Sequence, residues 1–245
     1  MANGYSLHVG LDFVNSDDYN GSEWPLDVAV KDMISMRDLA AKQKFKTTCL
    51  QNEEATISAF ISGVRSIKDK VKAGDIFLLT YAGHGYQTKD QNGDEEEGDG
   101  KDENLCLFDG LFVDDKLNEL FCEFPAGVRI LVVSDCCHGG SIHKYGLADT
   151  VEEVPTEEQD EPLASVILLS GTADNQEAYE GEENGRFTEC LLEVWDEGEF
   201  EGNYLAFKRA IKKKIRRKYG AQQSVMLSYS GPHGIIFKEQ IPFTI

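Results

Sequence analysis

The chain has 245 residues, of which 41% are hydrophobic and 28% are charged. This length and composition are typical of one folded domain with a sizeable core, and they exclude wholesale disorder and rod-like repeats. The chain has 24 lysine and arginine residues and 44 aspartate and glutamate residues, so its formal net charge is −20. Because nucleic acids and anionic membranes are polyanions, this balance argues against both as partners and suits a cationic peptide segment or a divalent metal.

No apolar run approaches the roughly 18 residues that a membrane span needs. The first residues lack the basic and apolar regions of a signal peptide. The six cysteines include no CxxC pair, which in a chain of this size is typical of reduced thiols rather than of a disulfide framework. We therefore expect a cytoplasmic protein.

Short apolar, β-branched runs alternate with helical patterns along most of the chain. This alternation favours an α/β fold in which helices cover both faces of a mostly parallel sheet. The expected strands are residues 6–11, 46–50, 75–81, 128–134, 165–170 and 225–230. The expected helices are residues 26–42, 53–71, 115–123, 186–195 and 203–217.

Three polar stretches, residues 86–104, 138–162 and 172–185, are expected to be loops. The first two follow the carboxyl ends of buried strands. In an open α/β sheet this edge is where ligands bind, and long loops there are more often functional than accidental.

A histidine and a cysteine follow two of the central strands. His84 comes after the strand at 75–81, and Cys137 comes after the strand at 128–134. A Cys–His pair can catalyse acyl transfer: the imidazole takes the thiol proton, the thiolate attacks a carbonyl, and the imidazolium protonates the leaving amine. The backbone N–H groups of Gly85 and Cys137 are the expected donors to the oxyanion.

The segments YAGHG at 81–85 and SDCCHGGS at 134–141 resemble the caspase and metacaspase family of cysteine peptidases. The stretch at 87–98 resembles the loop after the catalytic histidine of type I metacaspases and bacterial caspase-like proteins. The stretch at 184–192 is similar to the small-subunit helix of bacterial members. The resemblance implies a caspase-like sandwich around a six-stranded, mostly parallel sheet. It further implies one peptidase domain, 1–245, in which 1–143 is large-subunit-like, 144–164 an intersubunit loop and 165–245 small-subunit-like.

By this resemblance His84 is the general base and acid. Cys137 rather than Cys136 is the nucleophile, since the family pattern is Asp-x-Cys-His-x-Gly. Asp135 lines the primary specificity pocket, where a carboxylate favours Arg or Lys before the scissile bond and repels Asp. Ala82 is a further expected substrate-binding residue.

The first-helix segment of metacaspases usually presents a cysteine and, three residues on, an aspartate to this pocket. Aligned on Lys31-Asp32-Met33, these two positions hold Leu26 and Ala29. Asp27 lies nearby and is the expected additional substrate-binding residue. Basic specificity is therefore expected to rest mainly on Asp135.

Many metacaspases are activated by Ca²⁺ held by a loop acid, an Asp-Asp pair and a further Asp after the nucleophile. Asp99 and the pair Asp114-Asp115 match the first parts of this pattern. The last position is Lys144, whose ammonium opposes a hard cation that needs about six oxygen ligands. The chemistry needs no cofactor, and Ca²⁺ is a candidate activator; the competing interpretation of Asp114 is a plain helix N-cap.

Lys144 has a second interpretation. Caspase-like zymogens are often cut between the two subunits, and Lys144 is the only Lys or Arg between Cys137 and Arg186. A self-processing enzyme with a basic preference would cut after it. We expect no appended domain, so activation is expected through processing, ions or a separate partner protein.

Other interpretations of the same residues stay open. Without the paired motifs, Cys137 and His84 would be a buried thiol and a core histidine, and Cys136 is expected in the core or the pocket wall. His138 and His143 could join the two cysteines in a zinc site, although adjacent cysteines splay apart. The basic cluster at 208–218 is expected to be a solvated helix face. The alternative function is a caspase-fold interaction module with little turnover.

Overall fold

The computed structural model describes residues 2–89, 101–136, 147–148, 162–172, 181, 183–220 and 223–245. Asp99, Cys137 and Lys144 lie outside these ranges, as do most of the expected loops at 138–162 and 172–185. His138 and His143 of the alternative zinc site also lie outside them.

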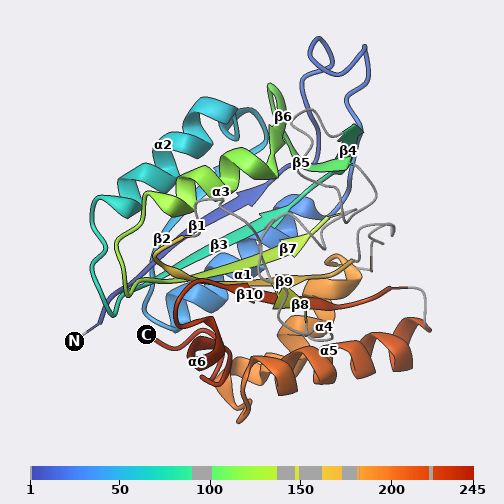
Figure 1. Ribbon diagram of the computed structural model, residues 1–245. Coiled ribbons are helices and arrows are strands. Elements are labelled where there is room, and N and C mark those ends of the chain that lie inside the picture. Colours follow the sequence, from blue (N-terminus) through green and yellow to red (C-terminus); the bar gives the residue numbers. More distant parts are fainter. Residues whose placement is uncertain are drawn as a thin grey trace.

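The central sheet has the strand order β2-β1-β3-β7-β9-β10-β8 (Figure 1). The first five strands in this order, β2, β1, β3, β7 and β9, run parallel, and β10 runs antiparallel to β9. The expected six-stranded, mostly parallel sheet is confirmed, and the short strand β8 pairs with β10 at the edge. The bounds are β1 (Gly4–Gly10), β2 (Lys46–Gln51), β3 (Ile76–Ala82), β7 (Arg129–Asp135), β8 (Leu147–Ala148), β9 (Ser165–Ser170) and β10 (Met226–Ser230).

Helices cover both faces of this sheet (Figure 1). One face carries α2 (Ile57–Lys68) and α3 (Asp114–Cys122), and the other carries α1 (Ala29–Lys42), α4 (Arg186–Trp195) and α5 (Tyr204–Tyr219). A short helix, α6 (Gly234–Lys238), lies near the amino-terminal ends of the parallel strands. Two 3-10 turns, Asn52–Glu54 and Asp196–Gly198, complete the helical elements of the described residues.

Each face of the sheet has its own hydrophobic core. Strand β3 contributes to both: Phe77 and Leu79 pack on the side of α2 and α3, whereas Ile76 and Leu78 pack on the side of α1, α4 and α5. All seven residues of β3 are buried. Because side chains alternate between the faces of a strand, a strand covered on both faces has a nearly continuous apolar run. This requirement explains why the central strands were evident in the sequence.

A second sheet corrects both ends of the expected loop at 86–104, whose middle, 90–100, lies outside the described residues. It consists of β4 (Gly85–Lys89), β5 (Lys101–Leu107) and β6 (Gly110–Val113), all antiparallel. The buried side chains of β5 are partly polar and bond across the pair: the Asn104 amide donates to the Tyr86 carbonyl (3.1 Å) and to the Thr88 hydroxyl (2.9 Å). Hydrogen bonds thus replace the apolar alternation by which a strand is normally predicted.

Asp114 is not the N-cap of α3. The helix begins at Asp114 itself, and the N-cap position is Val113, the last residue of β6. The Asp114 side chain accepts a hydrogen bond from the backbone N–H of Asp115 (3.0 Å). The strand runs into the helix without an intervening turn, so no separate capping residue is present.

Candidate active site

The carboxyl ends of β3 and β7 lie side by side. In the last register pair of the two strands, Ala82 is opposite Asp135. His84 comes two residues after Ala82 and is partly buried. The parallel pairing therefore brings the segments after both strands to one edge of the sheet, as the sequence predicts.

The imidazole of His84 is held by a backbone carbonyl. Its Nε2 lies 2.9 Å from the carbonyl oxygen of Trp24, and the two rings meet edge to face with centroids 5.6 Å apart. Since a carbonyl only accepts hydrogen bonds, Nε2 carries the proton in this contact. Proton exchange with a thiol must then use Nδ1.

The turn that carries His84 is fixed by Tyr81. The buried phenol lies 2.7 Å from the carbonyl oxygen of His84 and 2.9 Å from that of Cys106, and it donates to them. The backbone N–H of Cys106 also donates to the carbonyl of His84 (3.1 Å). A Cβ at Gly83 would lie 2.8 Å from the Tyr81 hydroxyl oxygen, so this position has room for glycine only. These contacts tie the histidine to both β3 and β5.

Of the two adjacent cysteines, the structure describes Cys136 and not Cys137. Cys136 is fully buried in the core beneath α2 and α3, with its sulfur 3.1 Å from the Ser134 hydroxyl. Its carbonyl accepts a hydrogen bond from the Thr172 hydroxyl (2.6 Å). Cys137 lies outside the described residues, so its role as nucleophile stays a prediction.

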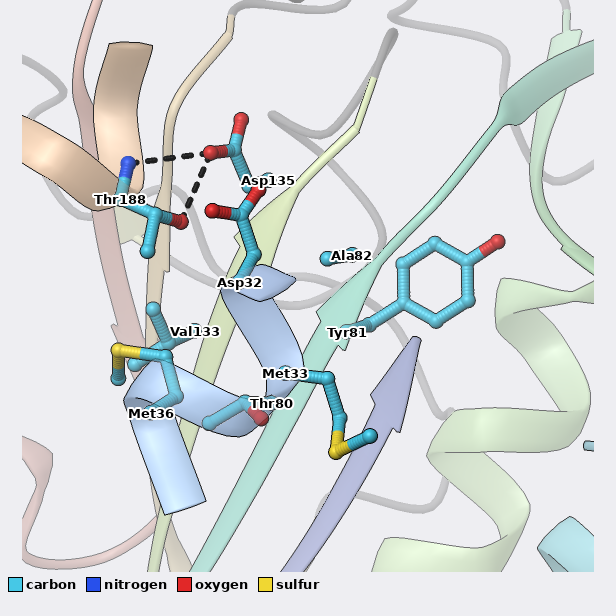
Figure 2. Close-up of a pocket in the computed structure, with 9 residues that line it drawn as sticks. All are labelled: Asp32, Met33, Met36, Thr80, Tyr81, Ala82, Val133, Asp135 and Thr188. Atoms are coloured by element: carbon cyan, nitrogen blue, oxygen red, sulfur yellow. Dashed lines mark hydrogen bonds between the residues drawn. The ribbon is translucent and has the colours of Figure 1, made fainter. Parts of the chain in front are cut away.

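Two carboxylates lie together beside this edge (Figure 2). Asp135 ends β7, and Asp32 comes from the first turn of α1. Both line a small cavity of about 10 Å³, room for roughly one water molecule. The other lining residues are Met33, Met36, Thr80, Tyr81, Ala82, Val133 and Thr188.

Both carboxylates bond the segment that begins α4. Asp32 accepts hydrogen bonds from the Asn184 amide (2.8 Å) and from the backbone N–H of Gly185 (3.0 Å). Asp135 accepts from the backbone N–H (3.0 Å) and the hydroxyl (2.8 Å) of Thr188, both at its Oδ2 atom. The carboxylates thereby join β7 and α1 to α4 and partly offset their own desolvation.

Burial changes the acidity of this pair. Desolvation, and next the neighbouring Asp135 carboxylate, raise the pKa of Asp32 to about 8, against the bonds from Asn184 and Gly185. Burial also raises the pKa of Asp135, and the bonds from Thr188 oppose this rise. Two buried carboxyl groups that line one small cavity do not ionise independently, so the pair holds a proton near neutral pH. A cation bound between them would displace that proton.

The remaining expected site residues fall at different places. Gly85 begins β4, directly after His84, and Ala82 lines the small cavity. Asp27 is exposed and does not line the cavity. Asp114 and Asp115 begin α3. Within the described part of the chain, no three His, Cys, Asp or Glu residues gather as a metal site would require.

The sequence prediction does not include Asp32 as a pocket residue, whereas the structure places it in the cavity. The expected alignment placed Leu26 and Ala29 at the positions of the metacaspase cysteine and aspartate. A shift by three residues puts Ala29 and Asp32 there, and Asp32 is the residue that lines the cavity with Asp135. The signal was an aspartate in an apolar helix pattern, where burial of a charge needs a reason.

Together, this sheet with helices on both faces and the histidine at its carboxyl edge define a caspase-fold α/β protein. The family model described as the caspase domain matches residues 13–242. The chain belongs to this family, as the sequence resemblance implied.

Individual relatives agree with this assignment. Metacaspase-1 of Schizosaccharomyces pombe is 34% identical over 115 residues, which are 45% of this chain and 25% of that protein. A Geobacter sulfurreducens protein of known crystal structure is 32% identical, with a TM-score of 0.81 and 99% of both chains covered. Caspase-1 of Spodoptera frugiperda, at 15% identity, shares the fold alone, with a TM-score of 0.62 over 94% of this chain and 88% of that chain.

The chain spans about a quarter of the length of the S. pombe metacaspase and 29% of a Plasmodium falciparum metacaspase-1. Among the described helices, none is both long and apolar enough to cross a membrane.

Proposed function

We propose that this protein is a cysteine endopeptidase that cleaves after Arg or Lys. Nδ1 of His84 takes the proton of the Cys137 thiol, and the thiolate attacks the scissile carbonyl. The imidazolium then protonates the leaving amine, and water hydrolyses the resulting thioester. The backbone N–H groups of Gly85 and Cys137 stabilise the oxyanion.

The observation that carries the specificity is the pair of buried carboxylates, Asp32 and Asp135, next to the strand that leads to His84. Burial of two neighbouring carboxylates lowers the stability of the fold unless hydrogen bonds or a bound cation offset the loss of hydration. Hydrogen bonds to α4 account for one oxygen of Asp135 and for Asp32, but Oδ1 of Asp135 has no hydrogen-bond partner among the described residues. An ammonium or guanidinium supplies the missing donors and neutralises the pair.

Further parts of the proposal concern activation. Autoprocessing after Lys144 would separate the large-subunit-like part from the small-subunit-like part. Ca²⁺ activation would use Asp99, Asp114 and Asp115; among the described residues no further His, Cys, Asp or Glu joins the Asp114–Asp115 pair. No step of the reaction depends on the ion. A cytoplasmic location is also part of the proposal; the described cysteines form no disulfide with one another, as is usual where thiols are kept reduced.

A panel of fluorogenic peptides ending in Arg, Lys or Asp tests the proposal, with and without Ca²⁺. We expect cleavage of the Arg and Lys peptides and none after Cys137→Ala or His84→Ala. Cleavage after Asp would contradict the role of Asp32 and Asp135. If the protein cleaves no peptide of the panel, the interaction module is the better description.

A further inference from the structure

The residue before α4 is a glycine, although its backbone does not require one. Gly185 occupies the N-cap position with φ −55° and ψ 145°, angles open to every residue type. Ser, Thr, Asn and Asp are preferred there because their side chains accept a hydrogen bond from the first turn. In this chain the carboxylate of Asp135 performs that role by accepting the N–H of Thr188. Neither backbone angles nor capping therefore explains the glycine.

Space explains it. A Cβ at position 185 would lie 2.5 Å from Oδ2 of Asp135 and 2.8 Å from Oδ2 of Asp32. Both distances are shorter than real carbon–oxygen contacts. Neither carboxylate can retreat without loss, because Oδ2 of Asp135 accepts two hydrogen bonds from Thr188 and Asp32 accepts from Asn184 and Gly185. A larger residue would push the carboxylates apart or break these bonds.

We propose that Gly185 is a specificity-determining residue: it keeps open the gap between the Asp32 and Asp135 carboxylates, which has room for one terminal nitrogen of an Arg or Lys side chain. This inference rests on the proposed basic specificity. A methyl group at position 185 shields the carboxylates and moves them, so it weakens binding of a cation more than binding of a neutral side chain of the same shape.

The test compares peptides that end in arginine with peptides that end in citrulline, the neutral analogue of nearly the same shape. For the wild type we expect kcat/KM to be much higher for arginine than for citrulline. Gly185→Ala is expected to lower this ratio at least tenfold. A general disturbance of folding would lower kcat/KM for both peptides alike and leave the ratio unchanged.

Gly181→Ala is the matched control. A Cβ at Gly181 would lie 2.6 Å from the carbonyl oxygen of Asn184, so the variant disturbs the same turn without entering the gap between the carboxylates. Its arginine-to-citrulline ratio is expected to equal that of the wild type. An equal fall of the ratio in both variants would contradict the inference.

A second pair of variants tests whether Gly185 acts through the carboxylates. Asp32→Ala removes one of the two clashes and leaves the one with Asp135, so Gly185→Ala is expected to lower the ratio by a smaller factor in the Asp32→Ala background than in the wild type. An equal factor in both backgrounds would mean that Gly185 acts apart from Asp32 and would contradict the inference.

Different results would contradict the proposed basic specificity and the inference about Gly185. A wild-type protein that cleaves arginine and citrulline peptides equally contradicts the proposed basic specificity itself. A wild type that prefers arginine, with the same preference in Gly185→Ala, leaves the proposed function standing and removes the inference about Gly185.

Discussion

Asp32 and Asp135 come from positions more than a hundred residues apart, yet they line one cavity of about the volume of a water molecule. Each carboxylate has hydrogen bonds to the start of α4, so both have a structural role. The structural role and the proposed binding of a cation are separable by experiment, since amide side chains keep the shape and lose the charge.

Asp32→Asn and Asp135→Asn are expected to lower kcat/KM for arginine peptides by roughly 30-fold or more each. This corresponds to about 2 kcal/mol, the lower range for truncating one partner of a buried charge pair. Hydrolysis kinetics with arginine and citrulline peptides measure the effect.

Asp75→Asn is the control. Asp75 is also buried and accepts backbone N–H bonds, from Asn3 (2.7 Å) and Lys72 (3.1 Å), but it lies just before the opposite end of β3. This variant is expected to lose stability and to keep the substrate preference. Selectivity that falls equally in all three variants would mean that the effect is structural.

At the scale of elements, the turn from β3 to β4 sets the position of His84. The Tyr81 hydroxyl connects the His84 carbonyl with that of Cys106 on β5. Tyr81 does not reach the reacting atoms through these bonds, so it is a positioning residue.

Tyr81→Phe is expected to lower kcat roughly tenfold with little change in KM, because a small displacement of a catalytic group slows the reaction itself. Steady-state kinetics on an arginine peptide separate the two constants. Tyr19→Phe serves as the comparison: Tyr19 is a buried tyrosine whose hydroxyl donates to the carbonyl of Leu107 (2.6 Å) and, among the described residues, makes no hydrogen bond to the His84 turn. Equal losses of kcat in both variants would remove the positioning role of Tyr81.

The elements differ in how far they could be predicted from the sequence. The central strands are covered on both faces, so Ile76–Ala82 and Ser165–Ser170 are nearly continuous apolar runs, which are not typical of loops. Strand β5 contains Asp102, Glu103 and Asn104, whose burial depends on partners that local sequence does not reveal. The β4–β6 sheet was therefore missed.

The candidate site, like the fold, could be predicted from the sequence only in part. His84 comes just after β3 and Asp135 ends the neighbouring strand β7, so strand order alone brings them to one edge. Asp32 reaches that edge from a helix, and its place depends on the register of α1 against the sheet. A shift of three residues changes which side chain faces the pocket, and only tertiary packing fixes that register.

At the scale of the whole molecule, two buried groups give stability opposite dependences on pH. Burial raises the pKa of Asp32 from an ordinary 3.8 to about 8, so the folded chain holds a proton that the unfolded chain has lost between these values. Burial, and next the charge of Arg37, lower the pKa of His8 from 6.5 to about 3. Stability therefore falls with rising pH through Asp32 between about 4 and 8, and rises with pH through His8 between about 3 and 6.5.

Above about pH 6.5 the contribution of His8 to the free energy of unfolding is nearly constant, whereas the contribution of Asp32 still changes with pH. The free energy of unfolding is expected to fall by about 1–2 kcal/mol between pH 6.5 and 8, since each proton of difference is worth about 1.4 kcal/mol per pH unit. Urea unfolding of the wild type and of Asp32→Asn at both pH values measures this. An equally steep decline in the variant would show that Asp32 is not its source.

The central claim is that Cys137 is a nucleophile activated by His84, and covalent labelling tests it most directly. The protein is treated with a peptide that ends in arginine and carries a thiol-reactive ketone, and the modified residue is mapped by mass spectrometry. We expect a single adduct on Cys137, formed far more slowly in His84→Ala and blocked by an excess of arginine peptide. An adduct on another cysteine, or labelling of Cys137 at the same rate without His84, would contradict the claim.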